Sequence, residues 1–226
     1  MPSSTVENYV KQLYLEQQRS SGHLIPMGRL ATRMKVVPGT ATAMVKTLAE
    51  SGLVEYEPRG GVRLSEGGHR LALHVLRRHR LVEQFLVEVL NFDWSEVHED
   101  AERLEHVISD LLLERIDALL GRPRFDPHGD PIPSPAGTVA DVELEPLPSC
   151  RVGDHVVVAR VLDQEAGFLR LMDRSGITPG SLLRITGFEP NADAITVQSA
   201  DGKPIPLGLT AAGKIQVRVE QSAPSV

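Results

Sequence analysis

The spacing of apolar residues predicts three short helices at the start of the chain. Apolar side chains recur every three to four positions over residues 5–18, 26–34 and 40–51, which is the period of one buried helical face. Residues 53–64 instead alternate about Gly60 and Gly61, a pattern typical of a β-hairpin. Two short helices around a tight turn, followed by a hairpin, predict a winged helix-turn-helix.

Helical spacing continues beyond the hairpin. Residues 65–90 are predicted to form one long helix with Ser65 as its cap, and Asp93 with Glu96 resembles the capping box of a second. A third helix is expected over residues 109–120. Its apolar residues, more numerous than one small buried face requires, are Leu111, Leu112, Leu113, Ile116, Leu119 and Leu120. This excess predicts a dimer interface.

The last third of the chain is predicted to form strands. Residues 122–148 are dense in proline and glycine, which is typical of a semi-rigid connection. Short β-rich runs follow at residues 155–162, 182–186, 194–198 and 214–219, and they predict a small β-barrel. We therefore expect a mainly α fold with β, in three domains. These are a winged helix-turn-helix over residues 1–74, a helical dimerisation and metal-binding domain over 75–140, and a barrel over 141–226.

Composition and charge narrow the class of protein. The 226 residues are 41% hydrophobic and 24% charged, as expected of a soluble globular protein. The sequence shows neither a membrane-length apolar run nor a secretory signal pattern, so we expect a cytoplasmic protein. Cys150 is the single cysteine, which excludes an internal disulfide and a multi-cysteine zinc site.

The net charge of −6 is unevenly distributed. Residues 1–75 carry a formal charge of +3 and the remainder carries −9, a pattern expected of a DNA-reading module joined to a sensing or assembly module. In a winged helix the third helix enters the major groove, and here hydroxyl and methyl groups dominate its start. The residues expected to meet bases or phosphates are Arg33, Lys35, Pro38, Gly39, Thr40, Thr42, Ala43, Lys46 and Arg59. The alternative is a winged helix that makes only protein contacts.

Histidine and glutamate cluster between residues 79 and 106. On a helix, His79 shares a face with Glu83, and Glu102 shares one with both His98 and His106, while Glu105 flanks the last pair. Imidazole nitrogen and carboxylate oxygen suit Mn(II), Fe(II), Co(II) and Zn(II). The pattern indicates a metal-binding surface. A solvated charged face is the alternative.

Three stretches carry a family resemblance. They are Arg77-Arg-His-Arg-Leu-Val-Glu-Gln-Phe-Leu86, Val97-His-Glu-Asp-Ala-Glu-Arg-Leu-Glu-His-Val-Ile-Ser-Asp110 and Gly129-Asp-Pro-Ile-Pro133. With the order of predicted elements, they resemble the diphtheria toxin repressor family of metal-dependent transcriptional regulators, whose last domain is SH3-like, or FeoA-like. The resemblance implies a homodimer that binds palindromic operator DNA and controls metal-ion homeostasis.

The resemblance also implies two metal sites. Glu102, Glu105 and His106 would form a primary site with a residue of the first helix, where alignment points to Asn8, with Glu7 as the alternative. His79, Glu83 and His98 would form an ancillary site with barrel residues, of which Gln164 is the first candidate and Glu165 the second.

Metal preference follows from the same resemblance. Carboxylate at Glu102, where iron-sensing relatives have cysteine, favours Mn(II), with Fe(II), Co(II), Zn(II) or Cd(II) as ions that could bind in vitro. Lys11 lies where a manganese relative has a bridging glutamate, so a close two-metal site is not expected.

Two other functions are alternatives to a metal-activated regulator. A winged-helix regulator that senses iron or an organic ligand would leave the His/Glu cluster less specific. A metallohydrolase would need a catalytic signature such as HExxH, and the sequence contains none, so we expect no enzyme.

Overall fold

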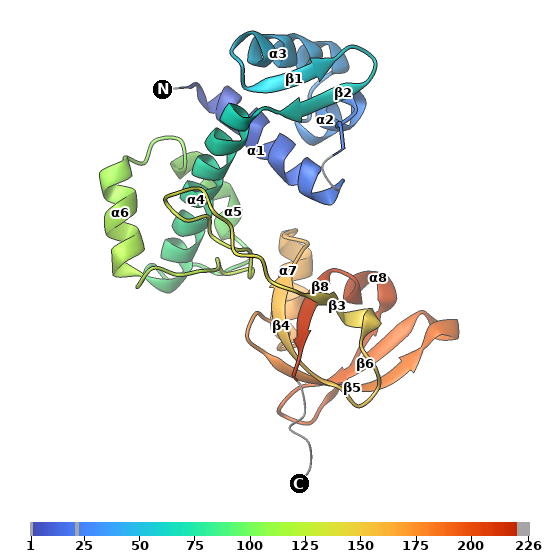
Figure 1. Cartoon of the computed structure of the whole chain (residues 1–226). Helices are drawn as coiled ribbons and strands as arrows, with labels where there is room; N and C mark the ends of the chain where they lie inside the picture. The colour runs from blue at the N-terminus through green and yellow to red at the C-terminus, as the bar shows by residue number, and fades with distance from the viewer. Residues whose placement is uncertain (1, 21–22, 221–226) are drawn as a thin grey trace. The chain divides into compact units, whose positions relative to one another are not determined.

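The computed structural model describes residues 2–20 and 23–220, which form two compact units (Figure 1). The N-terminal unit comprises Met1–His79, Glu102–Leu113 and Pro133–Val139. The C-terminal unit comprises Arg80–Ala101, Glu114–Ile132 and Ala140–Val226. Among the described residues, no helix is long and apolar enough to cross a membrane.

The N-terminal unit begins with the predicted winged helix-turn-helix. Its elements are α1 (Ser4–Arg19), α2 (Met27–Arg33), α3 (Pro38–Glu50), β1 (Val54–Glu57) and β2 (Gly61–Leu64). The strands β1 and β2 pair antiparallel, and Figure 1 shows this hairpin beside α3. Helix α3 begins at Pro38, two residues earlier than predicted, because proline at the first helical position already has a helical φ and needs no hydrogen-bond acceptor.

The core of this unit ties the hairpin to the helices. Val10, Leu13 and Leu48 are almost fully buried together with residues of the hairpin. Ile25 and Val62 exchange two backbone hydrogen bonds of 2.8 and 3.0 Å, which fix strand β2 against the segment before α2. The helix α1 is therefore a part of the winged-helix core, and a force applied to α1 acts on α3 through packed side chains.

Three further helices follow, α4 (Glu66–Glu88), α5 (Val97–Leu104) and α6 (Asp110–Leu119). The predicted cap of α4 is confirmed, since Ser65 Oγ accepts a hydrogen bond from the Gly68 amide at 3.1 Å. Asp93 instead accepts from the Ser95 amide at 2.8 Å and α5 begins only at Val97, so the predicted capping box with Glu96 is wrong.

The prediction of one helical face from His98 to His106 is also wrong. Helix α5 ends at Leu104, because the amides of Val107 and Ile108 both donate to the Leu104 carbonyl at 3.1 Å. Glu105 and His106 therefore lie in the turn between α5 and α6.

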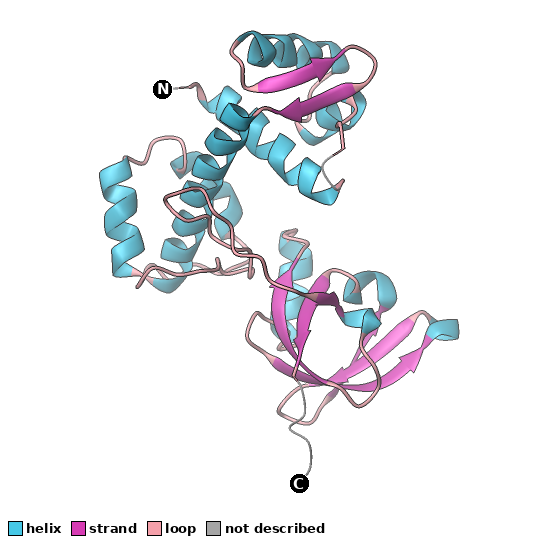
Figure 2. Ribbon diagram, viewed as in Figure 1, coloured by secondary structure: helices cyan, strands magenta, loops and turns pink. Residues whose placement is uncertain are grey.

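The C-terminal unit contains a six-stranded antiparallel sheet in the order β3-β8-β4-β5-β6-β7, as predicted for a small barrel. The strands are β3 (Glu145–Pro146), β4 (His155–Val161), β5 (Leu182–Glu189), β6 (Ala194–Gln198), β7 (Pro204–Gly208) and β8 (Ile215–Val219). Figure 2 shows the strands curving around a common interior, where Val158, Ile185 and Ile195 are fully buried.

The described barrel contains strands and short helices that the sequence pattern does not predict. Strand β7 contains Pro204 and Pro206, which argue against a strand in the sequence but are tolerated at the edge of a sheet. Helix α7 (Ala166–Arg174) lies between the predicted strands at residues 155–162 and 182–186, and Glu165 caps it by accepting from the Phe168 amide at 3.0 Å. A four-residue helix, α8 (Leu209–Ala212), precedes β8.

The apolar residues of α6 form a buried group and an exposed group. Leu113 and Ile116 are buried, whereas Leu111, Leu112 and Leu119 are 66%, 51% and 65% exposed. An apolar helix face open to solvent is typical of an interface, so the predicted dimer contact on α6 stays a prediction.

We expect Gly68→Ala to destabilise the N-terminal unit strongly, while Gly67→Ala serves as a matched control. A Cβ at residue 68 would lie 1.9 Å from the Leu53 carbonyl oxygen, whereas at residue 67 the nearest atom would be 3.7 Å away. Overpacking of this kind costs roughly 1–3 kcal/mol or more. Gly67→Ala should instead stabilise by up to about 1 kcal/mol through helix propensity. Urea unfolding midpoints of the two variants measure the difference, and equal midpoints would contradict the packing of α4 on Leu53.

Candidate metal centre and DNA-reading helix

Polar side chains from three segments meet inside the N-terminal unit. We call this group the α1 cluster, and it consists of Glu7, Asn8 and Lys11 of α1, His79 of α4, Glu102 at the end of α5, and Glu105 and His106 of the following turn. Glu7, Lys11, His79 and Glu105 are each 5% exposed or less. The turn after α5 thus delivers its side chains to a helix almost a hundred residues earlier in the chain.

His106 lies between three oxygen atoms. Its Nδ1 is 2.6 Å from Glu7 Oε2, while its Nε2 is 2.8 Å from Asn8 Oδ1 and 3.4 Å from Glu105 Oε1. The two nitrogens of the ring therefore have different partners. A carboxylate orients the ring through Nδ1, whereas Nε2 points at an amide oxygen and a second carboxylate. Metal-binding histidines commonly have this arrangement, with an oxygen acceptor behind the nitrogen that does not bind the ion.

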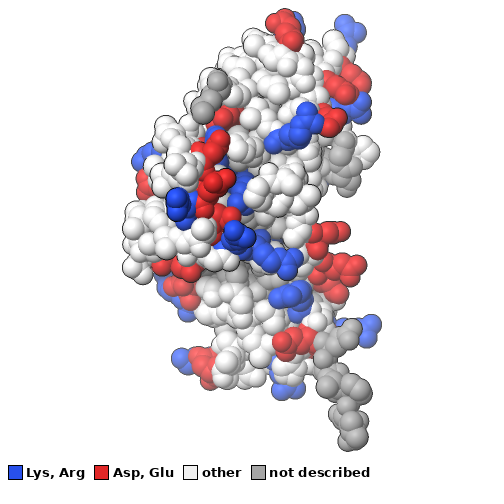
Figure 3. All heavy atoms as spheres, turned by 60° about the vertical axis from the view of Figure 1, so that its left-hand side comes forward, with Lys and Arg blue, Asp and Glu red and all other residues white. Residues whose placement is uncertain are grey.

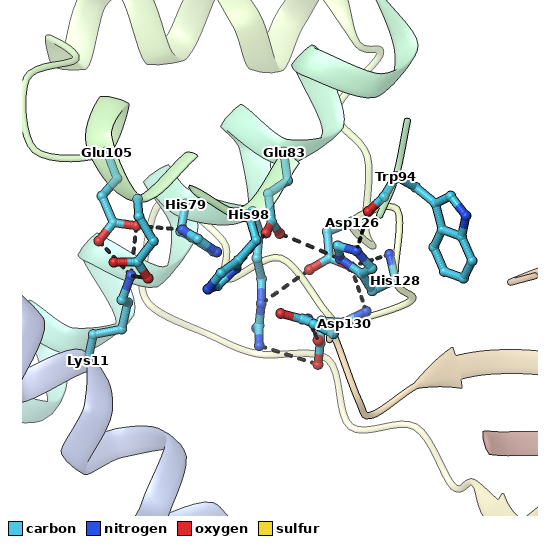
Figure 4. A network of polar contacts seen from close by, with 12 residues as sticks. Lys11, His79, Glu83, Trp94, His98, Glu105, Asp126, His128 and Asp130 are labelled. Carbon is cyan, nitrogen blue, oxygen red and sulfur yellow. Dashed lines mark hydrogen bonds and ion pairs between the residues drawn. The ribbon is translucent and has the colours of Figure 1, made fainter. Parts of the chain in front are cut away.

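Lys11 occupies the other half of the α1 cluster. Its Nζ lies 2.6 Å from Glu102 Oε1 and 2.6 and 2.8 Å from the two oxygens of Glu105 (Figure 4). His79 Nδ1 also contacts Glu105, at 2.6 Å from Oε2. Glu105, which is fully buried, thus has an ammonium and an imidazole as partners. Leaving a buried charge without its partner costs roughly 3–5 kcal/mol, so each of these contacts is important for the fold.

A second group of polar residues lies in the C-terminal unit. We call it the Glu83 cluster, and it contains Glu83 of α4 with Asp126 and His128 of the connection after α6, and His98 of α5 beside them. Glu83, Asp126 and His128 each offer one ligand atom within 4.8 Å of the others, and all three are buried. His98 Nδ1 is 3.3 Å from Glu83 Oε1. Figure 4 shows His128 between Asp126 and the Trp94 carbonyl.

The two ring nitrogens of His128 have different surroundings. His128 Nε2 is 2.9 Å from the Trp94 carbonyl oxygen, which can only accept, so Nε2 carries the proton. Its Nδ1 has no hydrogen-bond partner among the described residues and lies 3.8 Å from Glu83 Oε2. The imidazole therefore presents Nδ1 to the carboxylates.

The charges of the Glu83 cluster are only partly balanced. Burial, together with the carboxylates of Asp130 and Glu83, raises the pKa of Asp126 to about 7. Burial lowers the pKa of His128, but Glu83 and Asp126 outweigh it, and the net shift of that pKa is upward. Buried carboxylates that raise the pKa of Asp126 in this way favour the binding of a cation.

The predicted ligands are distributed over the two clusters. The primary set of Glu102, Glu105, His106 and Asn8 lies together in the α1 cluster, and Glu7 and Lys11 belong to the same group. The ancillary set His79, Glu83 and His98 offers ligand atoms within 4.8 Å of one another, and His79 also contacts Glu105 of the primary set.

The barrel candidate Gln164 donates to Asp130 Oδ2 at 3.0 Å, whereas Glu165 caps α7.

Sequence reasoning missed two residues of the Glu83 cluster. The predicted ligand sets include neither His128 nor Asp126. Both belong to a proline-rich connection without periodicity, so helical spacing could not have found them. The available signal was position, because Asp126-Pro-His128 directly precedes the Gly129–Pro133 stretch that carries the family resemblance.

Family comparisons cover almost the whole chain. Residues 1–62 match the iron dependent repressor N-terminal DNA binding domain, residues 65–134 match the iron dependent repressor metal binding and dimerisation domain, and residues 145–219 match the FeoA domain. The iron-dependent repressor IdeR of Mycobacterium bovis is 31% identical over 208 residues, which are 88% of this chain and 85% of that protein. The chain belongs to the iron-dependent repressor family.

The relatives of this repressor include proteins named for iron and proteins named for manganese. The diphtheria toxin repressor of Corynebacterium efficiens is 31% identical over 66% of this chain and 64% of its own length. A manganese-dependent transcriptional repressor, solved in complex with manganese, is 39% identical with a TM-score of 0.86, covering 95% of this chain and 100% of its own. The manganese regulator SloR is 30% identical with a TM-score of 0.74, over 97% of this chain and 100% of its own. The names of these relatives are those of repressors and regulators, and the chain described here is a metal-dependent DNA-binding repressor of the same family.

Helix α3 of the repressor has an exposed N-terminal half. Among its predicted DNA contacts, Pro38, Gly39, Thr40, Ala43 and Lys46 are exposed. Lys35 and Arg59 are exposed too, and both have a left-handed backbone, with φ of 54° and 69°. The Thr42 hydroxyl donates to the Pro38 carbonyl at 2.8 Å, so it can reach DNA only as an acceptor. This half of α3 therefore presents mainly methyl, hydroxyl and backbone groups.

One buried carboxylate pairs with three arginines from the end of α1 and from α2. Glu16 is fully buried and pairs with Arg19 at 3.0 Å, with Arg33 at 2.8 Å, and with Arg29. Burial by itself raises the pKa of Glu16, but the three guanidinium groups lower it more. Arg33, predicted to contact DNA, is thus held by Glu16 with about half of its side chain exposed. On the face of the molecule in Figure 3, side chains of both charges lie interspersed.

Proposed function

We propose that the repressor is a homodimer that binds palindromic operator DNA when it is activated by a divalent metal ion. Mn(II) is the preferred ion. The repressor controls metal-ion homeostasis and acts in the cytoplasm, where the DNA is. The observation that carries this proposal is the position of His106. Its ring connects the turn after α5 to Glu7 and Asn8 of α1, and α1 belongs to the winged-helix core. An ion held there acts directly on the DNA-reading domain.

The donor atoms around His106 Nε2 fit a metal site. Nε2, Asn8 Oδ1 and Glu105 Oε1 converge, and Glu102 has a carboxylate in the same cluster. Glu7 lies on the other side of the ring, which supports a role as the acceptor that orients His106 rather than as a ligand. The geometry therefore favours Asn8 over Glu7 as the ligand from α1.

The chemistry of these donors supports Mn(II). Oxygen dominates the donor set, and thiolate and thioether, which favour softer ions, do not take part. Relatives with solved structures respond to manganese or bind cadmium or zinc, and the mycobacterial relatives are iron-dependent repressors. Fe(II), Co(II), Zn(II) and Cd(II) are therefore the ions to compare with Mn(II) when metal is titrated into the protein.

The Glu83 cluster supports a second site in the C-terminal unit. Glu83, Asp126 and His128 Nδ1 face one another, and the Trp94 carbonyl accepts from Nε2 of His128, which fixes the orientation of the ring. A bound cation would neutralise the carboxylates that raise the pKa of Asp126.

A metal ion can increase the affinity for DNA only if the ion binds more tightly to one arrangement of the winged helix than to another. Because Asn8 belongs to α1, a ligand bond to Asn8 forms only when α1 lies against the turn after α5. Two recognition helices of a dimer must be about 34 Å apart to enter successive major grooves. The exposed leucines of α6 support the dimer that sets this distance.

Asn8→Ala should reduce the Mn(II)-stimulated affinity for operator, while Asn8→Asp should increase it by adding a charged ligand. Both variants keep Glu102, Glu105 and His106, so much of the metal affinity should remain. Calorimetry with Mn(II) and fluorescence anisotropy with operator at saturating Mn(II) measure the two quantities. If Asn8→Ala binds operator as tightly as the parent, the ligand from α1 is another residue, with Glu7 as the next to test.

His128→Ala should reduce the number of Mn(II) ions bound per chain by one. Replacement removes the only imidazole nitrogen that faces Glu83 and Asp126 in that trio. His155→Ala is the matched control, because His155 is an exposed histidine on strand β4. Metal content after gel filtration measures the stoichiometry. An unchanged stoichiometry in His128→Ala would exclude the second site.

Lys46→Ala should weaken binding to all DNA sequences and reduce the slope of log affinity against log salt by about one, because one phosphate contact is lost. Lys203→Ala, an exposed lysine before β7 in the barrel, should leave the slope unchanged. Anisotropy titrations between low and moderate salt measure the slope. A loss limited to one operator base would assign Lys46 to base readout instead.

A further inference from the structure

The most unusual feature of the α1 cluster is a buried lysine among the proposed metal ligands. Lys11 is 5% exposed, and its ammonium group makes three contacts of 2.6–2.8 Å with the carboxylates of Glu102 and Glu105. An ammonium group has three N–H donors and no acceptor, so these three contacts satisfy it completely.

The contacts connect segments that are far apart in the chain. Lys11 is 91 residues from Glu102 and 94 from Glu105. Since Lys11 is on α1, the ammonium group links the winged-helix core to the end of α5 and the turn after it. A metal ion bound by Glu102, Glu105 and an α1 ligand would link the same segments.

We propose that Lys11 is a tethered cation that holds α1 against residues 102–105 even when no metal ion is bound. It cancels one of the two negative charges of Glu102 and Glu105 and occupies the space between them. A single activating ion then binds beside it, at the Nε2 face of His106. Lys11 thus limits the α1 cluster to one ion and makes part of the attachment of α1 independent of metal.

The residues around Lys11 could hold a further ion if the ammonium were removed. His79, Glu102 and Glu105 offer ligand atoms within 4.8 Å of one another, and Lys11 Nζ contacts both of the carboxylates in that group. Removal of the ammonium leaves the buried carboxylate of Glu105 with its imidazole partner but without a permanent cation.

Lys11→Met tests the proposal, because methionine has a similar volume and no charge. In chelator, the melting temperature of the variant should fall by roughly 10 °C, the scale expected when one partner of a buried ion pair is removed from a chain of this size. On addition of Mn(II), the variant should bind one ion more per chain than the parent and regain more thermal stability than the parent gains. Lys203→Met, on the barrel surface, should match the parent in all three measurements.

Either of two results overturns the proposal: a Lys11→Met protein that melts with the parent in chelator, or one that binds no more Mn(II) than the parent. If Lys11→Met does not fold, the double variant Lys11→Met/Glu102→Gln decides, since it removes one negative charge with the positive one. A folded double variant supports the tethered cation, and a double variant as unstable as the single one overturns it.

The inference rests on the proposed function only in its metal measurements. If the parent protein bound no Mn(II), the proposed function would fail, whereas a lower melting temperature of Lys11→Met in chelator would still identify Lys11 as the internal cation. The two failures are therefore distinguishable in one set of samples.

Discussion

Buried carboxylates determine how distant segments of this repressor come together. A carboxylate that leaves water must find a cation or a donor, and in both units that partner comes from another part of the chain. Glu16 gathers arginines from α1 and α2, Glu105 gathers Lys11 and His79, and Asp130 contacts Arg80 and Arg160. Hydrophobic burial makes the units compact, while these ion pairs decide which helix faces which turn.

The same constraint explains how a regulator can be built from structural ion pairs. Carboxylates that the protein balances only in part have a remaining affinity for cations, and that affinity depends on the arrangement of the segments that supply them. In the α1 cluster, both oxygens of Glu105 contact the Lys11 ammonium group, and one of them, Oε1, also lies 3.4 Å from His106 Nε2. The fold and the proposed sensing therefore depend on one carboxylate.

Local patterns in the sequence were sufficient to predict the winged helix-turn-helix, the cap at Ser65 and four of the barrel strands, because these depend on periodicity and turn chemistry. They failed where tertiary context decides. The end of α5 at Leu104 and the strand with Pro204 are set by neighbouring backbone. The position of His128 beside Glu83 could not be predicted from spacing, because Glu83 is 45 residues earlier and only the folded chain brings them together.

The connection around Gly129 has a further consequence for how the barrel is attached. Gly129 has φ +85°, and a Cβ there would lie 2.0 Å from the Ala159 carbonyl oxygen, while the Val161 amide donates to the His128 carbonyl at 2.9 Å. Strand β4 therefore lies directly against the backbone that presents His128. A chain shortened to its first two domains would lose this support, so the barrel cannot be exchanged or deleted as an independent module without altering the histidine that it holds in place.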